Sequence, residues 1–148
     1  MTYSIGEMAK RLGVAPSTLR YYDKEGLLPF VNRSKGGIRI FEDKDFEWLQ
    51  IIGCLKKTGM PIKDIKTFIE MAMQGDDTID SRLELILKQK SVVEVQINEL
   101  SDVLKILNFK QWYYETAKSE GTTSVPREMT LEDLPEEYRE IRKRLRGE

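Results

Sequence analysis

Residues 76–118 contain neither glycine nor proline, and this stretch constrains the fold more than any other feature of the sequence. Apolar residues recur along it at alternating steps of four and three, which is the heptad spacing of a coiled-coil helix. One helix over this range would be roughly 65 Å long at ~1.5 Å per residue. The repeat consists of Ile79, Leu83, Ile86, Val93, Ile97, Leu100, Leu104 and Leu107, with Lys90 at the one position that breaks it.

The apolar stripe of this helix needs a partner, because the rest of the sequence predicts only shorter helices. A second copy of the chain is the simplest partner, so we predict a homodimer. The predicted dimerisation residues are Leu83, Ile86, Val93, Ile97, Leu100, Leu104 and Leu107. The alternative is a core helix in a monomeric bundle, whose other helices would be too short to cover the whole stripe.

Two short helices near the N-terminus are predicted from their start and stop signals. Ser4 and Glu7 have the spacing of a capping box, and Gly13 is a typical helix stop. After a short turn, Pro16 stands where a first helical residue is favoured, and Gly26 ends the second helix. Two short helices joined in this way are typical of a helix-turn-helix.

The segment that follows changes from helical to strand-like patterning. Residues 32–37 form a basic turn with two glycines, and residues 38–41 alternate as in a short strand, so we predict a hairpin, or wing. A second pair of helices is predicted over residues 43–57 and 62–73, with a break between them at residues 58–61. The sequence therefore predicts a mainly α fold with a winged helix-turn-helix.

Charge is distributed unevenly along the chain. Residues 1–40 carry seven basic and three acidic side chains, a net charge of +4, although the whole chain has a net charge of −1. The remaining residues therefore carry a net charge of −5. A basic N-terminal segment on an otherwise acidic chain indicates that this end meets a polyanion.

Composition excludes several classes of site. Cys54 is the only cysteine and the chain has no histidine, which excludes the usual zinc sites and the Ser-His-Asp and Cys-His catalytic arrangements. We therefore expect no metal, no cofactor and no enzymatic activity; an enzyme that uses carboxylates such as Glu136 and Glu137 is the remaining catalytic alternative. No apolar run is long enough to cross a membrane and no secretory signal is visible, so we expect a cytoplasmic protein.

Three segments, at residues 3–7, 13–23 and 26–28, together resemble the MerR family of transcriptional regulators. The most specific part is the run Thr18-Leu19-Arg20-Tyr21-Tyr22 followed by Gly26-Leu27-Leu28. The resemblance is strong over residues 2 to about 75 and extends to the long helix in architecture only. Two features depart from the family. The wing reads Gly37-Ile38-Arg39-Ile40-Phe41, where the family commonly has an aromatic residue after the glycine and a tyrosine near the end. Ala15 stands where a Ser or Thr cap is common, which would weaken the helix start by ~0.5–2 kcal/mol.

The resemblance implies a DNA-binding regulator with an antiparallel coiled-coil dimerisation helix. Such a dimer would bind a pseudo-palindromic promoter element between the two hexamers that RNA polymerase recognises, and would distort the DNA so that polymerase engages both. RNA polymerase would thus be an indirect partner, through the promoter. The chain would divide into a DNA-binding domain (1–75), a dimerisation helix (76–118) and a tail with a short charged helix (119–148).

The second helix of the helix-turn-helix would be the recognition helix that enters the major groove. Short hydroxyl side chains in its first turns can reach base edges, and longer tyrosine and arginine side chains can reach phosphates. The predicted DNA-binding residues are Ser17, Thr18, Arg20, Tyr21 and Tyr22 in this helix, and Arg33, Lys35 and Arg39 in the wing. The alternatives are packing for Tyr22, an ion pair with Asp23 for Arg20, and an ordinary solvated turn for the wing cations.

The effector is less constrained than the DNA-binding function. Family members that sense metals resemble one another in having several cysteines near the dimerisation helix, and this chain has no cysteine there. We expect the C-terminal tail to be mobile or lightly docked, and too short to enclose a drug pocket of ~300–1,000 Å³. Cys54 lies off the apolar stripe of its helix. One branch of the family, associated with aldehyde and thiol stress, resembles this chain in carrying a lone cysteine in this helix. It is either a sensor thiol or an inert small residue. The rival function is a coiled-coil adaptor that binds protein rather than DNA.

Overall fold

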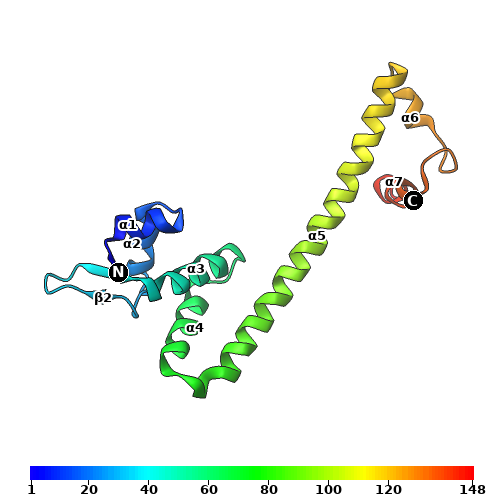
Figure 1. The fold of residues 1–148 in the computed structure, drawn as a ribbon. Coiled ribbons are helices and arrows are strands. Elements are labelled where there is room, and N and C mark those ends of the chain that lie inside the picture. Colours follow the sequence, from blue (N-terminus) through cyan, green and yellow to red (C-terminus); the bar gives the residue numbers. More distant parts are fainter. The chain divides into compact units, whose positions relative to one another are not determined.

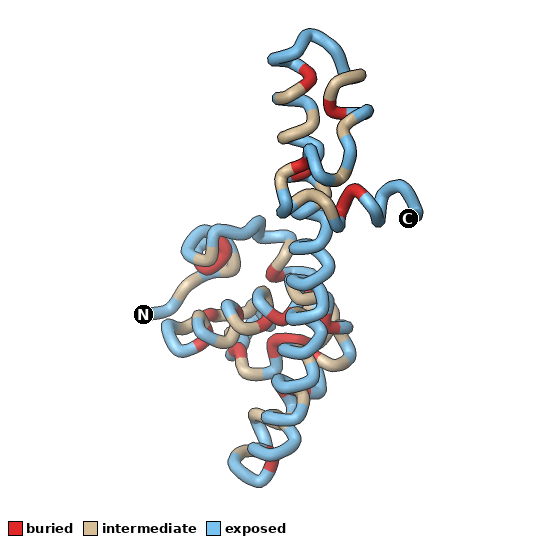
Figure 2. The backbone as a smooth tube through the Cα atoms, turned by 90° about the vertical axis from the view of Figure 1, so that its right-hand side faces the viewer, coloured by how far each residue is buried: buried red, intermediate tan, exposed pale blue.

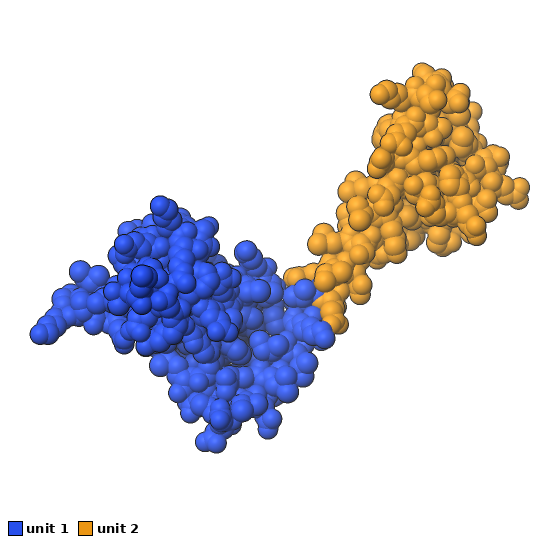
Figure 3. Space-filling view, viewed as in Figure 1, with its two compact units in different colours: residues 1–93 blue, residues 94–148 orange.

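The computed structural model describes residues 1–148, whose internal contacts form two compact units, Met1–Val93 and Glu94–Glu148 (Figure 3). Helices dominate both units, as the sequence predicts (Figure 1). In chain order the elements are β1 (Thr2–Tyr3), α1 (Ile5–Leu12), α2 (Pro16–Lys24), β2 (Asn32–Arg33), β3 (Arg39–Glu42), α3 (Asp43–Lys57), α4 (Ile62–Gln74), η1 (Asp76–Thr78), α5 (Ile79–Glu120), α6 (Ser124–Glu128) and α7 (Glu136–Arg146).

The helix-turn-helix consists of α1 and α2, and its local signals act as predicted. The Ser4 backbone N–H donates to Glu7 Oε2 over 2.8 Å, and the Glu7 backbone N–H donates to Ser4 Oγ over 3.3 Å. Gly13 ends α1 with a left-handed backbone at φ 70°, which glycine adopts without steric cost. Ala15, the N-cap residue of α2, makes no capping hydrogen bond, because its side chain has no hydrogen-bonding group.

The wing is a small antiparallel sheet in which β3 lies between β1 and β2. The hairpin from β2 to β3 turns at Gly37, whose φ of 79° suits glycine, and the Ser34 backbone N–H donates to the carbonyl of Ile38 over 2.8 Å. The wing predicted from residues 32–41 is therefore confirmed. The sequence did not predict β1, a short N-terminal strand that pairs Tyr3 with Phe41.

One hydrophobic core holds the first unit together. The second helical pair, α3 and α4, contributes apolar side chains to it, including Leu49, Ile52 and Leu55 of α3, while Trp48 packs at the edge. The start of α5 adds Leu85 to this core, and Gln89 Nε2 donates to Thr58 Oγ1 over 2.7 Å. The first part of the long helix therefore packs with the winged helix-turn-helix, beyond the boundary at residue 75 that the sequence suggested.

The long helix α5 is continuous over 42 residues, as predicted. Most of its surface is exposed (Figure 2). Six of the seven predicted dimerisation residues are exposed apolar side chains, from 37% exposed at Ile86 to 69% at Leu100, and Val93 is half-buried. The chain by itself leaves this heptad stripe uncovered.

The second unit has a core of its own, which corrects the expectation of a mobile or lightly docked tail. Residues after the long helix return onto it, so that Leu134 and Ile141 bury Phe109 of α5. Arg142 is buried and donates from Nη1 to the carbonyl of Pro126 over 3.0 Å. Residues 124–146 are thus packed structure, because their apolar side chains meet the aromatic end of α5. No helix of the chain is both long and apolar enough to cross a membrane.

Candidate nucleic-acid interface

One face of α2 is anchored in the core and the other is exposed. Leu19 is fully buried against the first unit's core. Ser17, Arg20 and Tyr21 are exposed, and Thr18 is half-buried. These four side chains stay available for contact with a ligand along the first two turns of the helix, as predicted for a recognition helix.

Tyr22 does not belong to this exposed face, which corrects its prediction as a DNA contact. Its side chain is only 5% exposed. Its hydroxyl lies close to Gly53 of α3: a Cβ atom built at Gly53 would be 3.9 Å from it. Burial raises the pKa of the Tyr22 phenol, with a smaller contribution from Tyr21. The packing alternative therefore holds for Tyr22, which fixes α2 against α3.

Asp23 joins the recognition helix to the wing. Its Oδ1 accepts from Arg39 Nε over 2.9 Å and lies 2.8 Å from Arg39 Nη2. The same carboxylate oxygen lies 3.3 Å from Arg33 Nη2, and Arg33 Nη1 donates to the carbonyl of Gly37 over 2.6 Å. Asp23 is therefore paired with the wing rather than with Arg20, which is an exposed residue of α2.

The three wing cations differ in how freely they can contact a polyanion. Arg39 is half-buried, and its Nη1 also donates to the carbonyl of Val31, so it orients the wing more than it faces solvent. Arg33 is exposed, with one side of its guanidinium held by Asp23. Lys35 is exposed at the tip of the hairpin. The structure thus leaves Arg33 and Lys35 as the wing cations best placed for phosphate contact.

Lys56 of α3 is a further cation at this surface that the sequence did not reveal. Its Nζ lies 4.6 Å from the centre of the Tyr21 ring and 5.4 Å from that of Tyr22, within the range of a cation–π interaction. No local pattern signals this contact, because α2 and α3 meet only through tertiary packing. Lys56 adds positive charge beside the exposed ring of Tyr21.

Cys54 is exposed and borders a hollow of about 540 Å³ beneath the recognition helix. The hollow is lined by Leu12, Val14, Thr18, Leu19, Tyr22, Leu49, Gln50, Gly53, Cys54, Lys56 and Lys57. The thiol therefore shares a surface with three residues of α2. Nothing in the sequence placed Cys54 next to the recognition helix.

Asp43 is a second link that sequence reasoning missed. Its carboxylate accepts from the N-terminal ammonium over 3.0 Å, from Arg11 Nη1 over 2.6 Å and from the Tyr3 hydroxyl over 2.9 Å. These hydrogen bonds, the N-terminal one first, lower the pKa of Asp43 to about 2. These hydrogen bonds to Asp43 join β1, α1 and α3, and α1 in turn packs against α2. No group of three or more Cys, Asp or Glu side chains in the chain could hold a metal ion.

Comparison with known proteins matches two family models to this architecture. A model described as MerR HTH family regulatory protein matches residues 3–72, and one described as MerR, DNA binding matches residues 46–108. An uncharacterised HTH-type transcriptional regulator of Haemophilus influenzae is 46% identical over 136 residues, which cover 92% of this chain and 98% of that protein.

Solved structures give the same result. HiNmlR, described as a MerR family regulator that lacks the sensor domain, was solved bound to promoter DNA; it is 44% identical with a TM-score of 0.79, over 91% of this chain and all of that one. A MerR family transcriptional regulator from Bacillus thuringiensis is 42% identical with a TM-score of 0.65, over 80% of this chain and 99% of that one.

Proposed function

Because the chain belongs to the MerR family of helix-turn-helix regulatory proteins, we propose that it controls transcription by binding promoter DNA as a homodimer. The observation that carries this proposal is the exposed face of α2 beside a wing that Asp23 holds in place. The DNA-bound state of HiNmlR, which matches over 91% of this chain, supports the same function. This activity is binding rather than catalysis, and its place is the cytoplasm, where a bacterial chromosome lies.

In the proposed complex, α2 lies in the major groove. Ser17 and Thr18 reach base edges, and Arg20 and Tyr21 bind phosphates. Arg33 and Lys35 of the wing bind phosphates on the flanking backbone. Arg39 acts mainly by orienting the wing, since its guanidinium is already held by Asp23 and Val31.

The exposed heptad stripe of α5 supports pairing of two chains. We propose that the two helices pair in antiparallel sense, so that the two recognition helices meet a pseudo-palindromic element. Bending such a site costs on the order of 1–6 kcal/mol, which the contacts of two recognition helices and two wings can offset. The distorted promoter then presents both hexamers to RNA polymerase, which is the indirect partner.

A gel-shift titration with the duplex upstream of the protein's own gene tests this function. The binding constant should fall steeply as salt rises, because phosphate contacts release counterions. The dimer should prefer the promoter over a scrambled duplex of the same composition. A coiled-coil adaptor, the rival function, would bind neither duplex, and that outcome would overturn the proposal.

We further propose that Cys54 is the sensor thiol through which electrophiles or thiol stress act on the regulator. The support is geometric: Cys54 borders the same hollow as Thr18, Leu19 and Tyr22, so a covalent adduct there would press on the recognition helix. A reporter assay should show an aldehyde response in the wild type and none in Cys54→Ala. An unchanged response in the variant would leave Cys54 as an inert small residue.

A further inference from the structure

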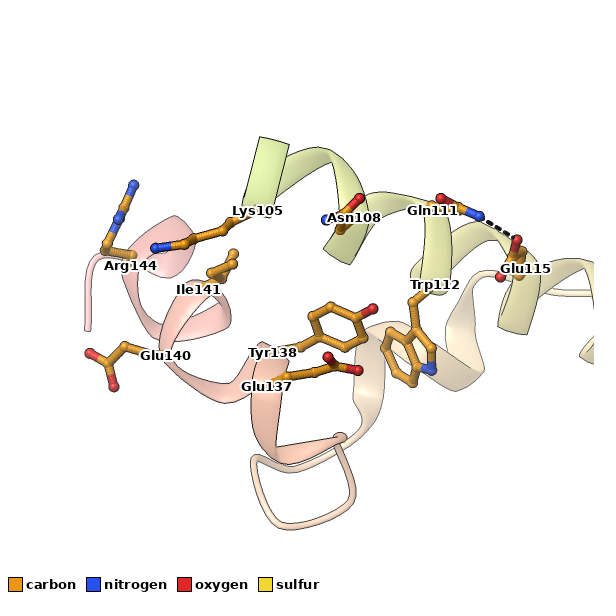
Figure 4. A pocket seen from close by; sticks show the side chains of 10 residues that line it. All are labelled: Lys105, Asn108, Gln111, Trp112, Glu115, Glu137, Tyr138, Glu140, Ile141 and Arg144. Atoms are coloured by element: carbon orange, nitrogen blue, oxygen red, sulfur yellow. Dashed lines mark hydrogen bonds between the residues drawn. The ribbon is translucent and has the colours of Figure 1, made fainter. Parts of the chain in front are cut away.

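The packing of α7 on the C-terminal part of α5 leaves two separate hollows that share no lining residue. The larger, of about 590 Å³, lies between the α5 and α7 side chains that Figure 4 shows. The sequence did not lead us to expect a hollow of this size in the C-terminal segment, which forms it because α5 supplies half of the lining. The smaller hollow, of about 220 Å³, lies where α5, α6 and α7 meet.

Cations line the smaller hollow, and no carboxylate does. Its lining residues are Phe109, Lys110 and Tyr113 of α5, Arg127 of α6, and Arg142, Leu145 and Arg146 of α7. Arg142 and Arg146 both donate from Nη2 to the carbonyl of Arg127, so two guanidinium groups converge on one oxygen. Lys110 Nζ lies 5.0 Å from the centre of the Tyr113 ring. We call Lys110, Arg127, Arg142 and Arg146 the cationic cluster.

Little within the chain neutralises the cationic cluster. One ion pair involves it, between Arg127 Nη2 and Glu128 Oε1 at 3.7 Å, and both side chains are exposed. Burial and then repulsion by Arg146 lower the pKa of Arg142, and the negative charge of Glu148 offsets part of this effect. A fixed group of four cations with one long ion pair creates a local positive field that favours an anionic partner.

The surroundings of the cationic cluster match a local anionic group better than a nucleic acid. Residues 94–148 carry nine basic and twelve acidic side chains, a net charge of −3. A polyanion that reached the hollow would therefore be repelled by the rest of the unit. Carboxylates on a protein surface fit a hollow of about 220 Å³ without this repulsion.

Two exposed carboxylates without a partner lie just before the other end of α5. They belong to Asp76 and Asp77 of η1, and no hydrogen bond or ion pair of the chain engages their side chains. In this first unit, α5 meets the other elements through Arg82, Leu85 and Gln89. Counted from Leu83 at heptad position a, Leu85 is at position c, and the two polar residues are at position g.

The α5 residues of the hollow occupy the same two heptad positions, with Lys110 at g and Tyr113 at c. In an antiparallel pair of helices, the g positions of one helix lie beside the g positions of the other. Six of the seven predicted dimerisation residues face one another when Leu83 faces the partner's Leu107, whereas a shift of one heptad either way pairs only four. This register sets Tyr113 level with the partner's Asp77, on the same edge of the dimer.

We propose that the cationic cluster of each protomer binds the carboxylates of Asp76 and Asp77 of the partner subunit. The inference rests on the proposed homodimer and deepens it, because it joins the C-terminal unit of one chain to the DNA-binding unit of the other. Arg82 does not neutralise these carboxylates, since its guanidinium donates to the Gly75 carbonyl over 3.2 Å and to Thr78 Oγ1 over 3.0 Å. Parallel pairing would instead set each cluster beside its own copy, so the contact also selects the antiparallel sense.

Charge reversal in the full-length protein tests this contact, with the dimer Kd measured by sedimentation equilibrium over a dilution series. The acid-reversed variant is Asp76→Lys with Asp77→Lys, and the base-reversed variant is Lys110→Glu with Arg146→Glu. Each should raise the dimer Kd by at least about tenfold, because like charges then meet at both symmetry-related contacts. Arg127 and Arg142 stay unchanged, since their hydrogen bond holds α7 to α6.

Restoring opposite charges should restore the dimer. A combined variant with all four reversals should return the dimer Kd to within about threefold of the wild type. An equimolar mixture of the acid-reversed and base-reversed chains should form heterodimers, since each contact then joins a positive group to a negative one. Rescue of this kind is not expected from variants that merely unfold, and circular dichroism would verify that every variant keeps its helical signal.

Two control variants reverse the same number of charges on other faces. Asp80→Lys with Glu84→Lys changes exposed carboxylates of α5 at heptad positions e and b, away from the edge that carries g and c. Lys105→Glu with Lys143→Glu changes exposed cations of α5 and α7 that do not line the smaller hollow. Both controls should dimerise like the wild type.

Wild-type dimer affinity in either reversed variant would overturn the proposal, as would a combined variant that stays as weak as its parents. Loss of promoter affinity by the base-reversed variant at an unchanged dimer Kd would show that the hollow binds nucleic acid, which also overturns it. Gel shift measures promoter binding separately. A dimeric wild type that binds the promoter keeps the proposed function even if the charge contact fails, whereas a monomeric wild type that ignores the promoter removes both.

Discussion

Asp23 of α2 and Arg39 of β3 form a half-buried ion pair, with Nη2 2.8 Å from Oδ1, that links the recognition helix to the wing. Arg39 also donates from Nη1 to the carbonyl of Val31 at the base of the hairpin, so its guanidinium is held on two sides. The orientation of the wing relative to α2 is therefore set by one carboxylate, which Arg33 shares. We therefore expect the helix and the wing to bind DNA in the relative orientation that these contacts hold.

Asp23→Asn should weaken promoter binding about tenfold, a loss of about 1.4 kcal/mol, while the dimer stays intact. The amide keeps the size of the side chain but loses the charge that holds Arg39 and Arg33. Gel shift gives the affinity and thermal unfolding gives the stability. Glu47→Gln, an exposed charge change on α3, is the control and should bind like the wild type. Wild-type affinity in Asp23→Asn would mean that the wing does not need this anchor.

Arg20→Ala should weaken binding to all DNA sequences by a similar factor and reduce the slope of log K against log salt by about 1. The reason is that Arg20 is exposed on α2 and its proposed role is one phosphate contact. Lys118→Ala, which removes an exposed cation from the C-terminal unit, should leave the slope unchanged. If both variants reduced the slope equally, the salt dependence of DNA binding would depend only on the overall charge of the protein.

The two neighbouring tyrosines of α2, Tyr21 and Tyr22, should have different roles: the first in DNA binding and the second in stability. Tyr21→Phe should weaken DNA binding, because Tyr21 is exposed and its hydroxyl is the group proposed to reach phosphate. Tyr22→Phe should bind DNA normally, whereas Tyr22→Ala should lower the free energy of unfolding by about 3–5 kcal/mol, as for other buried aromatic truncations. Weaker binding by a stable Tyr22→Phe protein would restore Tyr22 as a DNA contact.

The elements that could be predicted from sequence are those with local signals. The capping box of Ser4 and Glu7, the glycine stop at Gly13 and the heptad repeat of α5 each depend on residues a few positions apart. Their geometry follows from the helix itself, so no knowledge of tertiary contacts was needed. The exposed stripe around Leu100 follows from the same repeat.

The interactions that could not be predicted join residues far apart in the chain. Arg39 lies 16 positions after Asp23, and the N-terminal ammonium lies 42 positions before Asp43. Many other cations could have filled these roles, and only the packed fold selects among them. For the C-terminal segment a signal was present, because Tyr138 and Ile141 are spaced three positions apart, as on one side of a helix, and Leu134 just before that helix can join them in covering Phe109.

Asp43 should make stability depend on pH in the acid range. Its folded-state pKa is about 2, below the ordinary value of 3.8, so its stabilising effect is complete above about pH 4 and is lost as the pH falls through 2. Thermal unfolding of the wild type and Asp43→Asn should differ by a constant amount from pH 7 to 4. The difference should shrink towards pH 2, where the wild-type carboxyl becomes neutral. A difference that persists undiminished at pH 2 would contradict the assignment.

Leu100→Asp should abolish the dimer and, with it, binding to the promoter. Leu100 is 69% exposed in the single chain, so the substitution leaves the fold of each protomer intact and acts only where a second helix packs. Light scattering should give the mass of one chain. Circular dichroism should retain the helical signal, because each end of α5 packs against other elements of its own chain. Val95→Asp is the matched control, because Val95 is also an exposed apolar residue of α5 but lies on the heptad face opposite the seam. That variant should remain a dimer that binds the promoter. A monomeric Leu100→Asp protein with wild-type promoter affinity would show that pairing along α5 is unnecessary for recognition.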